Sequence, residues 1–362
     1  MHFFFFVILY KLNITSMLNL PKRKKDTLIL MKIDADKLTN LTYKLYIYYI
    51  NVQKGWKTMK KRGRIIKIVS VILSIALVIS IGAVMYSNST KIDLGEVTIE
   101  EAPQKSENAT RIMSFNLRCV DDKEGSVYTR SQIATKIIDL YAPDSFGIQE
   151  ATPKWIAILD EEFEGKYARV GEGRSPIELF TEYSAVYYRK DKFNLIDSGT
   201  IWLSETPEKK YTKSFDSKHN RIATWAVLED KETGIRYTHI NTHLDHVLES
   251  TRVEQSKVLL NKISELKNET TVICTGDFNT YETAEAYSVM SKSMTDTKLV
   301  AKNSDTGITF HKYGTITEHK DGAIDFIFTT EGVEVDTYKI IRDTFKGYYP
   351  SDHYPVVADV IL

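Results

Sequence analysis

The sequence has little cysteine and lacks several common catalytic fingerprints. Its two cysteines in 362 residues, Cys119 and Cys274, are too few for a disulfide scaffold, although a single bridge between them stays open. There is no H-E-x-x-H, H-x-E or C-x-x-C motif, which argues against a catalytic zinc site. The sequence also has no P-loop, no dinucleotide fingerprint and no G-x-S-x-G nucleophile elbow. These absences disfavour zinc, nucleotide-binding and serine-hydrolase chemistry.

The formal net charge of zero is the sum of two parts with opposite signs. Residues 1–67 hold fifteen Lys and Arg against three Asp and Glu. Because the whole chain holds 48 of each kind, the remainder has 33 basic and 45 acidic residues, a net charge of −12. Proteins that bind long nucleic acids usually present a basic surface, so this balance weakens, without excluding, a nuclease acting on long duplexes.

An uncharged segment precedes the acidic part of the chain. Residues 68–85 are eighteen residues without a charge, near the lower limit for spanning a bilayer. A basic cluster at residues 60–64 stands before it, and no clear small-x-small cleavage site follows. We expect a transmembrane anchor, with a cleaved secretory signal as the alternative. The positive-inside rule then places the rest of the chain outside the cell, held at the cell membrane or secreted after cleavage.

These features divide the chain into four parts. Residues 1–58 form an extension that would be an artefact of gene prediction if translation begins at Met59. Residues 59–90 hold the basic region and the transmembrane or signal segment, and residues 91–109 are a polar, aperiodic linker. Residues 110–362 are long enough to bury a sizeable core, and we expect them to form a monomeric globular domain.

Hydrophobic periodicity over residues 110–362 indicates many strands and few helices. The strands are predicted at Arg111–Asn116, Ser145–Gln149, Tyr183–Tyr188, Leu195–Leu203, Ile222–Leu228, Tyr237–Thr242, Val272–Thr275, Ile324–Phe328 and Val356–Ile361. The helices are predicted at Ser131–Leu140, Lys154–Asp160, Glu249–Leu266 and Glu282–Ser291. The pattern favours an α/β fold, a four-layer αββα sandwich of two mostly antiparallel sheets with helices outside.

Polar side chains follow one of these strands directly. Gly276-Asp277-Phe278-Asn279 comes after the apolar run of residues 271–275. Side chains at positions i and i+2 of an extended segment point to one side, so the Asp277 carboxylate and the Asn279 amide are expected to converge on one ligand. Gly, Asp and Asn are also common turn formers, so a simple turn is the alternative.

The same pattern recurs at other strand ends. Carboxylate, amide or imidazole side chains end, interrupt or follow apolar runs at Asn116, Glu150, His243, Asp245, Asp325, Asp352 and His353. Oxygen and imidazole ligands without thiolates are typical of a hard divalent cation, Mg²⁺ or Mn²⁺. Hydrolysis by a metal-positioned water is then the favoured chemistry. His239 lies in the middle of a strand, and we expect it to be packed rather than functional.

Together these motifs resemble the endonuclease/exonuclease/phosphatase superfamily. The resemblance covers residues 110–362 and is carried, in chain order, by Ser114–Arg118, Gln149-Glu150, Asn241–Asp245, Gly276–Asn279, Ile324-Asp325 and Ser351–Pro355. Residues 199–207 further resemble a bacterial branch whose substrates are not settled. The superfamily includes pancreatic deoxyribonuclease, apurinic endonucleases, deadenylases, neutral sphingomyelinases and inositol-polyphosphate phosphatases.

The resemblance implies a metal ion and a positioned water. Glu150 would be the principal metal ligand, with Asn116 and Asp352 near the metal through direct or water contact. Asp277 and Asn279 would orient the attacking water and the scissile phosphate. The implied cofactor is Mg²⁺ or Mn²⁺.

The resemblance also implies two imidazoles beside the phosphate. His243 and His353 would flank it, one favouring deprotonation of the nucleophile and the other stabilising charge on the phosphoryl oxygens or the leaving group. Asp325 and Glu182 would be their acidic partners. The residues expected to bind substrate are Asn116, Arg221 and Asn241. For Arg221, a solvated surface arginine is the alternative to a phosphate clamp.

The implied activity is that of a divalent-metal-dependent phosphohydrolase, with a phosphodiesterase as the favoured form. A small phosphodiester or a phosphorylated metabolite suits the acidic domain better than polymeric DNA does. A secreted nuclease on DNA or RNA, a sphingomyelinase-like phospholipase C and a non-catalytic binding module stay open as alternatives. The expected substrate is therefore a phosphodiester or phosphomonoester of open identity.

Overall fold

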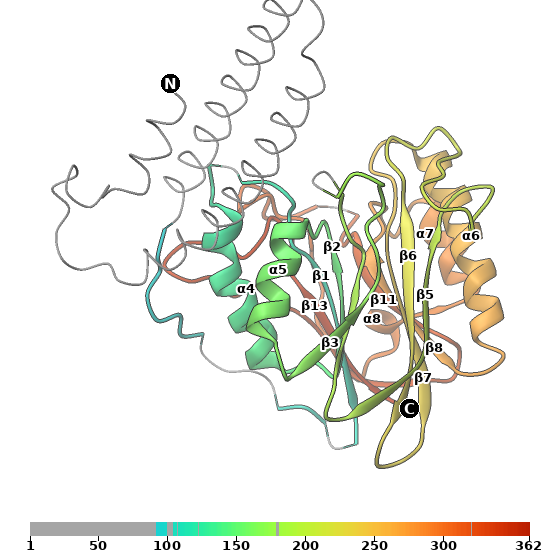
Figure 1. The fold of residues 1–362 in the computed structure, drawn as a ribbon, viewed down its shortest axis with the longest axis horizontal. Helices are drawn as coiled ribbons and strands as arrows, with labels where there is room; N and C mark the ends of the chain where they lie inside the picture. The colour runs from blue at the N-terminus through green and yellow to red at the C-terminus, as the bar shows by residue number, and fades with distance from the viewer. Residues whose placement is uncertain (1–91, 100–103, 107, 122, 179–180, 320) are drawn as a thin grey trace, which may run out of the picture. The chain divides into compact units, whose positions relative to one another are not determined.

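The structure is a computed structural model that describes residues 92–99, 104–106, 108–121, 123–178, 181–319 and 321–362 (Figure 1). The chain divides into two compact units, Met1–Gly82 and Ala83–Leu362, and the described residues belong to the second. The predictions for residues 1–58 and 59–90, and part of the predicted linker, fall outside the described residues. Within the described ranges, no helix is long and apolar enough to cross a membrane.

The first of two sheets has seven strands. They are β1 (Thr110–Asn116), β2 (Ser145–Gln149), β3 (Tyr167–Val170), β4 (Val186–Arg189), β10 (Asn303–Ser304), β12 (Glu334–Ile340) and β13 (Val356–Ile361). Their order is β10-β12-β13-β1-β2-β4-β3. Neighbours are antiparallel except for the parallel pairs β1·β2 and β10·β12.

The second sheet has six strands. They are β5 (Phe193–Trp202), β6 (Ile222–Asp230), β7 (Arg236–His243), β8 (Thr271–Asp277), β9 (Thr295–Asp296) and β11 (Asp325–Thr329). Their order is β5-β6-β7-β8-β11-β9, with β7·β8 as the parallel pair. Both sheets are therefore mixed but mostly antiparallel, as predicted.

The helices lie on the two outer faces of the pair of sheets (Figure 1). They are α4 (Val127–Tyr141), α5 (Pro153–Glu162), α6 (Glu249–Leu266) and α7 (Glu285–Ser291), whereas the short α8 (Thr297–Val300) contacts β11 of one sheet and β12 of the other. One apolar cluster joins α4 and α5 to the first sheet, a second joins α6 and α7 to the second sheet, and a third fills the space between the sheets. This confirms the predicted sandwich.

The alternation of side chains along the strands brings the polar strand ends between the sheets. On β1, Ile112 belongs to the cluster between the sheets, and Asn116 lies an even number of positions further along. On β8, Ile273 belongs to the same cluster, and Asp277 again lies an even number of positions further. Both polar side chains therefore point into the layer between the sheets, where their strands end.

All nine predicted strands and four predicted helices are present; the bounds of β2, α6 and β13 are as predicted, and the other elements have shifted ends. The strand predicted from Tyr183 begins at Val186, and the helix predicted from Glu282 begins at Glu285. The missed elements are β3, β9, β10, β12 and α8. In β12 the register shifts between Val335 and Thr337, which breaks the alternation that identifies a strand in a sequence.

The two cysteines are free thiols, so the bridge left open by the sequence is not formed. Cys274 has no exposed surface and packs in the cluster between the second sheet and its helices. It behaves as the small buried hydrophobe that the sequence predicts.

His239 ties the two sheets together through hydrogen bonds within the buried layer. Its Nδ1 lies 2.8 Å from Ser145 Oγ of the first sheet, and its Nε2 lies 2.8 Å from Thr275 Oγ1 of the second. The ring is fully buried, and this burial lowers the pKa of His239 to about 3. As expected from the sequence, His239 is a packed histidine rather than a functional one.

His239 should make the fold sensitive to acid. Its imidazole takes up a proton below an ordinary pKa of 6.5 in the unfolded chain but only near 3 in the folded chain, so stability is lost as the pH falls between these values. Between pH 7 and pH 5 the loss from this ring is about 2 kcal/mol, starting from a shift to about 3. Denaturant unfolding of wild type and His239→Gln at pH 7 and pH 5 measures this loss of unfolding free energy.

The His239→Gln variant should lose about 2 kcal/mol less than wild type on acidification. His319→Gln removes an imidazole that stacks on Tyr281 and serves as the matched control. An equal acid loss in wild type and His239→Gln would show that this ring does not set the acid sensitivity.

Candidate active site

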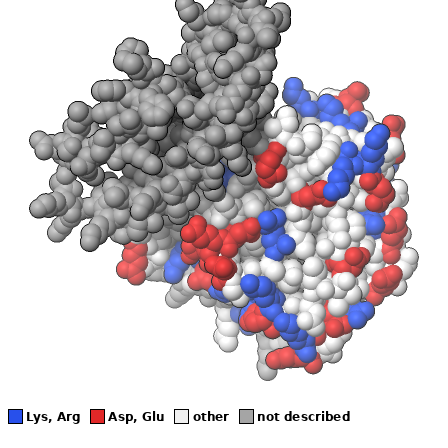
Figure 2. All heavy atoms as spheres, in the orientation of Figure 1, with Lys and Arg blue, Asp and Glu red and all other residues white. Residues whose placement is uncertain are grey.

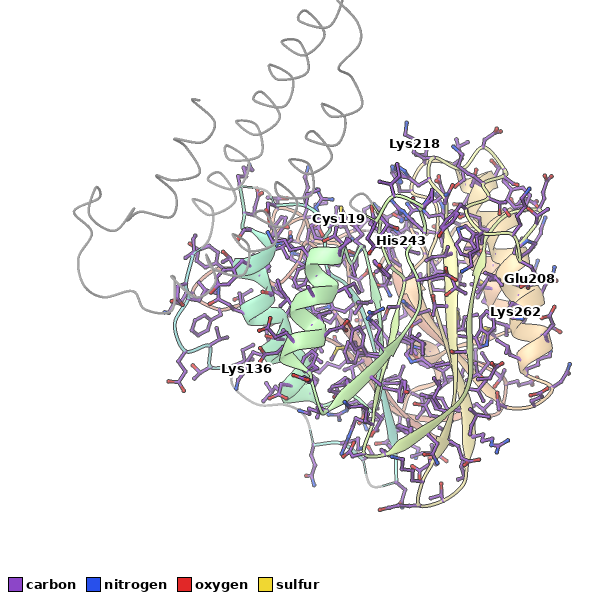
Figure 3. All side chains as sticks on the ribbon, viewed as in Figure 1. Cys119, Lys136, Glu208, Lys218, His243 and Lys262 are labelled. Carbon is purple, nitrogen blue, oxygen red and sulfur yellow. The ribbon has the colours of Figure 1, made fainter. Side chains whose placement is uncertain are left out.

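Polar side chains from both sheets meet at one end of the sandwich. They are Asn116 at the end of β1, Glu150 after β2, His243 ending β7, Asp277 ending β8, Asp325 opening β11 and His353 before β13. The strand registers place both His243 and Asp325 opposite Asp277. Figure 3 shows His243 at the same end as Cys119, which follows β1. The predicted strand-end residues thus come together.

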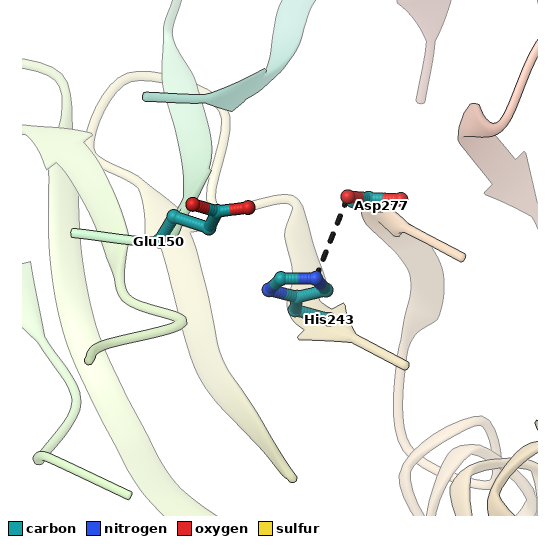
Figure 4. A group of neighbouring side chains, drawn as sticks. All are labelled: Glu150, His243 and Asp277. Carbon is teal, nitrogen blue, oxygen red and sulfur yellow. Dashed lines mark ion pairs between the residues drawn. The ribbon is translucent and has the colours of Figure 1, made fainter. Parts of the chain in front are cut away.

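The Asn116 amide connects two carboxylates from different sheets. Its Nδ2 donates to Asp277 Oδ2 at 2.8 Å and to Glu150 Oε1 at 3.3 Å. The backbone N–H of Cys119 donates to Glu150 Oε2 at 2.9 Å. Figure 4 shows the carboxylates of Glu150 and Asp277 with the His243 ring close to both. Asn116 therefore sets the spacing of the two acids.

Glu150 is held as a carboxylate in a constrained backbone. Burial by itself raises its pKa, but the hydrogen bonds from Cys119 and the positive charges of His353 and Arg118 outweigh it and lower the pKa of Glu150 to about 2. Its φ of 56° is left-handed, as are those of Arg118 (58°) and Asn279 (48°). Such conformations cost a non-glycine residue about 1 to 3 kcal/mol and concentrate at functional sites.

His353 forms a buried ion pair with Asp325. Its Nδ1 lies 2.8 Å from Asp325 Oδ2, and its Nε2 lies 3.9 Å from Asp277 Oδ2. Burial alone lowers the pKa of the ring, but the negative charges of Asp325 and Asp277 raise the pKa of His353 to about 10. His353 is therefore an imidazolium at neutral pH, and Asp325 is the acidic partner that the resemblance implied.

His243 has the opposite protonation state. Its Nε2 lies 3.5 Å from Asp277 Oδ2 (Figure 4). Burial, and next the positive charge of Arg221, hold the pKa of His243 well below its ordinary value. A neutral and a protonated imidazole therefore stand on either side of Asp277. Environments that push two similar groups apart in this way are typical of acid and base pairs.

The donor set fits a hard divalent cation. Two groups of side chains, Glu150 with His243 and Asp277, and Asp277 with Asp325 and His353, each have ligand atoms within 4.8 Å of one another. Burial and the charge of Asp325 raise the pKa of Asp277 above its ordinary value. Carboxylates crowded so closely repel each other, and a cation between them would relieve that repulsion. The oxygen-rich set suits Mg²⁺ or Mn²⁺.

Asp352 adds another carboxylate beside this group. It is 6% exposed, and its Oδ2 lies 3.6 Å from Nε of Arg118. Burial raises the pKa of Asp352, although the positive charge of His353 works against this. Asp352 belongs to neither of the two groups of possible ligands, so its predicted place near a metal ion stays a prediction.

Asn279 makes the turn that the sequence left open as an alternative. Its backbone N–H donates to Asp277 Oδ1 at 2.9 Å, and its Nδ2 donates to the Leu244 carbonyl at 3.2 Å. With a left-handed φ, Asn279 does not continue the strand. The turn is therefore formed, and it orients the Asp277 carboxylate, whereas convergence of Asp277 and Asn279 on one ligand stays a prediction.

Glu182 pairs with an arginine and not with His243. Its Oε1 accepts a hydrogen bond from Arg174 Nη2 at 2.6 Å. The nearest carboxylate to His243 is instead that of Asp277. The predicted pairing of Glu182 with an imidazole is corrected accordingly, because the loop before β4 brings Arg174 to it first. Burial still raises the pKa of Glu182.

Asn241 cannot bind a substrate in this structure. It has no exposed surface, and its Nδ2 donates to the carbonyls of Ile148 and Ala185 at 2.8 and 3.1 Å. Its Oδ1 accepts from Gln149 Nε2 at 2.6 Å and Thr275 Oγ1 at 3.0 Å. Both donors and both lone pairs of the amide are used. The predicted substrate contact is wrong, and Asn241 instead ties β7 to the first sheet.

Arg221 is buried, which excludes the solvated surface arginine that the sequence left open. It is 3% exposed, and its Nη2 donates to His246 Nδ1 at 3.1 Å. Burial, and next the positive charge of Arg174, lower the pKa of Arg221 to about 10. The guanidinium is thus held close to the site without a carboxylate bonded to it.

Sequence reasoning missed three contributors to the site. The backbone N–H of Cys119 binds Glu150, Arg118 lies beside Asp352, and Arg174 engages Glu182. A backbone donor leaves no mark on residue type, and Arg174 lies in a loop without hydrophobic periodicity. Arg118 stands two residues after Asn116 in a recognised motif, and this proximity was the one available signal.

Comparisons with known proteins agree with this geometry. The chain is 31% identical to an endonuclease/exonuclease/phosphatase from Bacteroides vulgatus, with a TM-score of 0.66 over 70% of this chain and 99% of that one. It is 29% identical to a mannosyl-6-phosphatase from Bacteroides thetaiotaomicron, with a TM-score of 0.65 over 70% and 99%. The human Nocturnin catalytic domain, 21% identical with a TM-score of 0.55 over 71% and 96%, shares the fold.

Among curated proteins, none matches the sequence. The profile of the Endonuclease/Exonuclease/phosphatase family matches residues 113–353, which include every strand end that carries the candidate site. The chain belongs to the endonuclease/exonuclease/phosphatase family, as its motifs predicted.

Proposed function

We propose that the chain hydrolyses phosphate esters with the help of a divalent cation, Mg²⁺ or Mn²⁺. The observation that carries the proposal is the pair of buried imidazoles, His243 neutral and His353 protonated, on either side of the Asp277 carboxylate. The family includes phosphoester hydrolases such as the mannosyl-6-phosphatase that is 29% identical to this chain. No nucleophilic serine or cysteine is required for this chemistry.

Glu150 is the proposed principal ligand of the cation, with Asn116 and Asp352 beside it. Glu150 suits this role because its carboxylate stays ionised, its pKa being about 2, and two hydrogen bonds fix its orientation. A bound cation would polarise the phosphoryl group and neutralise charge on its oxygens.

The two imidazoles have different proposed tasks. Neutral His243 can accept a hydrogen bond from the attacking water, so we assign to it the task of favouring deprotonation of that water. His353, protonated and held by Asp325, stabilises negative charge on the phosphoryl oxygens or the leaving group. Asp277 and Asn279 orient the water and the phosphate between the rings. Asp325 acts through His353 by holding its Nδ1.

A small phosphoester is the favoured substrate, and a phosphodiester is favoured within that class. The chain after residue 67 carries a net charge of −12, which disfavours long nucleic acids. Figure 2 shows acidic and basic side chains interspersed on the visible face, without a continuous basic stripe. The mannosyl-6-phosphatase among the similar structures makes a sugar phosphomonoester the second candidate.

Hydrolysis should require the divalent cation and the side chains of Asp277 and His353. With bis-p-nitrophenyl phosphate, the full chain should release p-nitrophenol in Mg²⁺ or Mn²⁺ and stop in EDTA. Asp277→Ala or His353→Ala should lower turnover at least about 10²-fold, because each removes a group that acts on water or phosphate. Colorimetric rates and circular dichroism measure activity and folding.

Asp305→Ala, which removes a carboxylate paired with Arg342, is the matched control and should keep its activity. Persistence of turnover after the change at Asp277 or His353 would refute the assignment of the site. Silence of the wild type on nucleic acid, lipid and sugar-phosphate panels would favour a binding module instead.

The protonation of His353 should depend on Asp325. In the metal-free full chain, the pKa of His353 is raised to about 10, so its ring should stay protonated up to pH 8. Asp325→Asn removes the negative charge that raises this pKa most, so the pKa of His353 should fall by at least about 1. Histidine-labelled NMR titration measures both values.

Asp305→Asn changes a carboxylate that pairs with Arg342 and is the control for loss of one negative charge. If the titration of His353 is the same in Asp325→Asn as in wild type, another group holds the proton on the ring and the division of tasks fails.

We also propose that residues 59–90 hold the domain at the outer face of the cell membrane, or release it if they are cleaved. The uncharged run of residues 68–85 behind a basic cluster supports this. The full chain with a C-terminal tag should be found in the membrane fraction or the medium, and protease added to intact cells should digest the anchored form. Recovery of an intact, protected chain in the soluble cell fraction would contradict it.

A further inference from the structure

A second group of charged and imidazole side chains lies beside the proposed metal centre. It consists of Arg174 in the loop between β3 and β4, His219 and Arg221 before β6, and His246 after β7. We call these four residues the arginine cluster. Ala223 pairs with Thr242 in the register of β6 and β7, so Arg221 and His243 come from adjacent ends of neighbouring strands.

Arg221 has buried donors without acceptors. It is 3% exposed, and within the described part of the chain its Nε and Nη1 have no hydrogen-bond partner. A guanidinium carries five N–H groups, and those on Nε and Nη1 are three of the five. Leaving buried donors of a charged group unpaired destabilises the folded chain. Such a side chain points to a missing acceptor.

The carboxylates near the cluster are already engaged. Glu182 accepts from Arg174 Nη2 at 2.6 Å. Asp245 accepts from Ser217 Oγ at 3.1 Å and from the backbone N–H groups of Lys218 and Val247, both at 2.8 Å. Neither carboxylate is hydrogen-bonded to Arg221, so the positive charge of this guanidinium lacks a bonded counter-ion.

Repulsion within the cluster agrees with this excess of positive charge. Burial and the charge of Arg174 lower the pKa of Arg221 to about 10. Burial, with the charges of Arg174 and Arg221, lowers the pKa of His219 to about 4. The positive charges of the cluster thus repel one another, and an anion bound between them would offset this repulsion.

One exposed ring contacts the buried guanidinium, and a second ring stacks on the first. His219 and His246 are both exposed and stack with their centroids 5.8 Å apart. The Nδ1 atom of His246 accepts from Arg221 Nη2, so this nitrogen is unprotonated. An anionic oxygen is a stronger acceptor than a neutral ring nitrogen. A phosphate oxygen could therefore replace the exposed His246 ring as the acceptor for Arg221.

We propose that the arginine cluster binds a second anionic group of the substrate, a phosphate or a carboxylate, next to the ester that is cleaved. This inference rests on the proposed phosphohydrolase function and narrows its substrates to esters that carry an additional negative charge. Arg221 and Arg174 would donate to the second anion, and the neighbouring ends of β6 and β7 keep it within reach of one small molecule.

Phosphate binding in the absence of metal tests the cluster. In EDTA, the crowded carboxylates at Glu150, Asp277 and Asp352 repel an anion, so inorganic phosphate should bind the full chain at the arginine cluster. Calorimetry should detect one phosphate per chain, and the Kd should rise at least about tenfold in Arg221→Gln and in Arg174→Gln. Acetate titrated in parallel distinguishes a carboxylate site from a phosphate site.

Arg169→Gln is the matched control, because Arg169 lies on β3 and pairs with Asp160 at the surface. It should bind phosphate like wild type. Arg221→Lys keeps the charge with fewer donors and should bind with intermediate affinity, which separates anion binding from a failure to fold. Absence of phosphate and acetate binding in wild type, or binding of phosphate with the wild-type Kd by the two glutamine variants, would overturn the proposal.

The two proposals fail separately. Bis-p-nitrophenyl phosphate has no second anionic group, so its metal-dependent hydrolysis tests the catalytic centre without the arginine cluster. Phosphate binding in EDTA requires the cluster and needs no turnover. Hydrolysis without phosphate binding would therefore retain the proposed function and reject the second site.

Discussion

The amide of Asn116 is the contact on which the site depends, because it joins two carboxylates that belong to different sheets. It donates a hydrogen bond to Asp277 of β8 at 2.8 Å and another to Glu150 after β2 at 3.3 Å. Neither acid is adjacent to the other along the chain, so their spacing depends on how the sheets pack. The amide can fix that spacing only because alternation along β1 directs Asn116 between the sheets. The layer of side chains between the two sheets therefore sets both the packing of the core and the geometry of the site.

Burial gives the side chains of that layer their chemical differences. The same loss of water acts on both imidazoles, yet His243 becomes neutral and His353 becomes protonated. The difference lies in their neighbours, since Arg221 acts on His243 and Asp325 on His353. In water these charges would be screened, and the two rings would titrate alike. The tightly packed sandwich is thus what makes one ring an acceptor and the other a donor.

Local sequence patterns predicted the strands and the polar residues at the strand ends. Apolar runs located nine strands, and the polar residues at their ends included Asn116, Glu150 and Asp277. The prediction failed for residues whose hydrogen-bond partners come from distant segments of the chain. Glu182 meets Arg174, which a loop supplies, and Asn241 binds the carbonyls of Ile148 and Ala185, which the other sheet supplies. Residue type cannot reveal a backbone partner, and periodicity cannot reveal which strands face each other.

Two groups of like charge lie at this end of the sandwich, one negative around Asp277 and one positive around Arg221. Carboxylates crowd around Asp277, which raises its pKa, whereas buried Arg221 has donors without acceptors and a lowered pKa. Each group is shifted toward its neutral form because folding removed water and placed charges of one sign close together. A cation at the first group and an anion at the second would each restore the charged form. A metal ion and an anionic substrate would therefore stabilise the folded chain as they bind, which couples recognition to the energetics of the core.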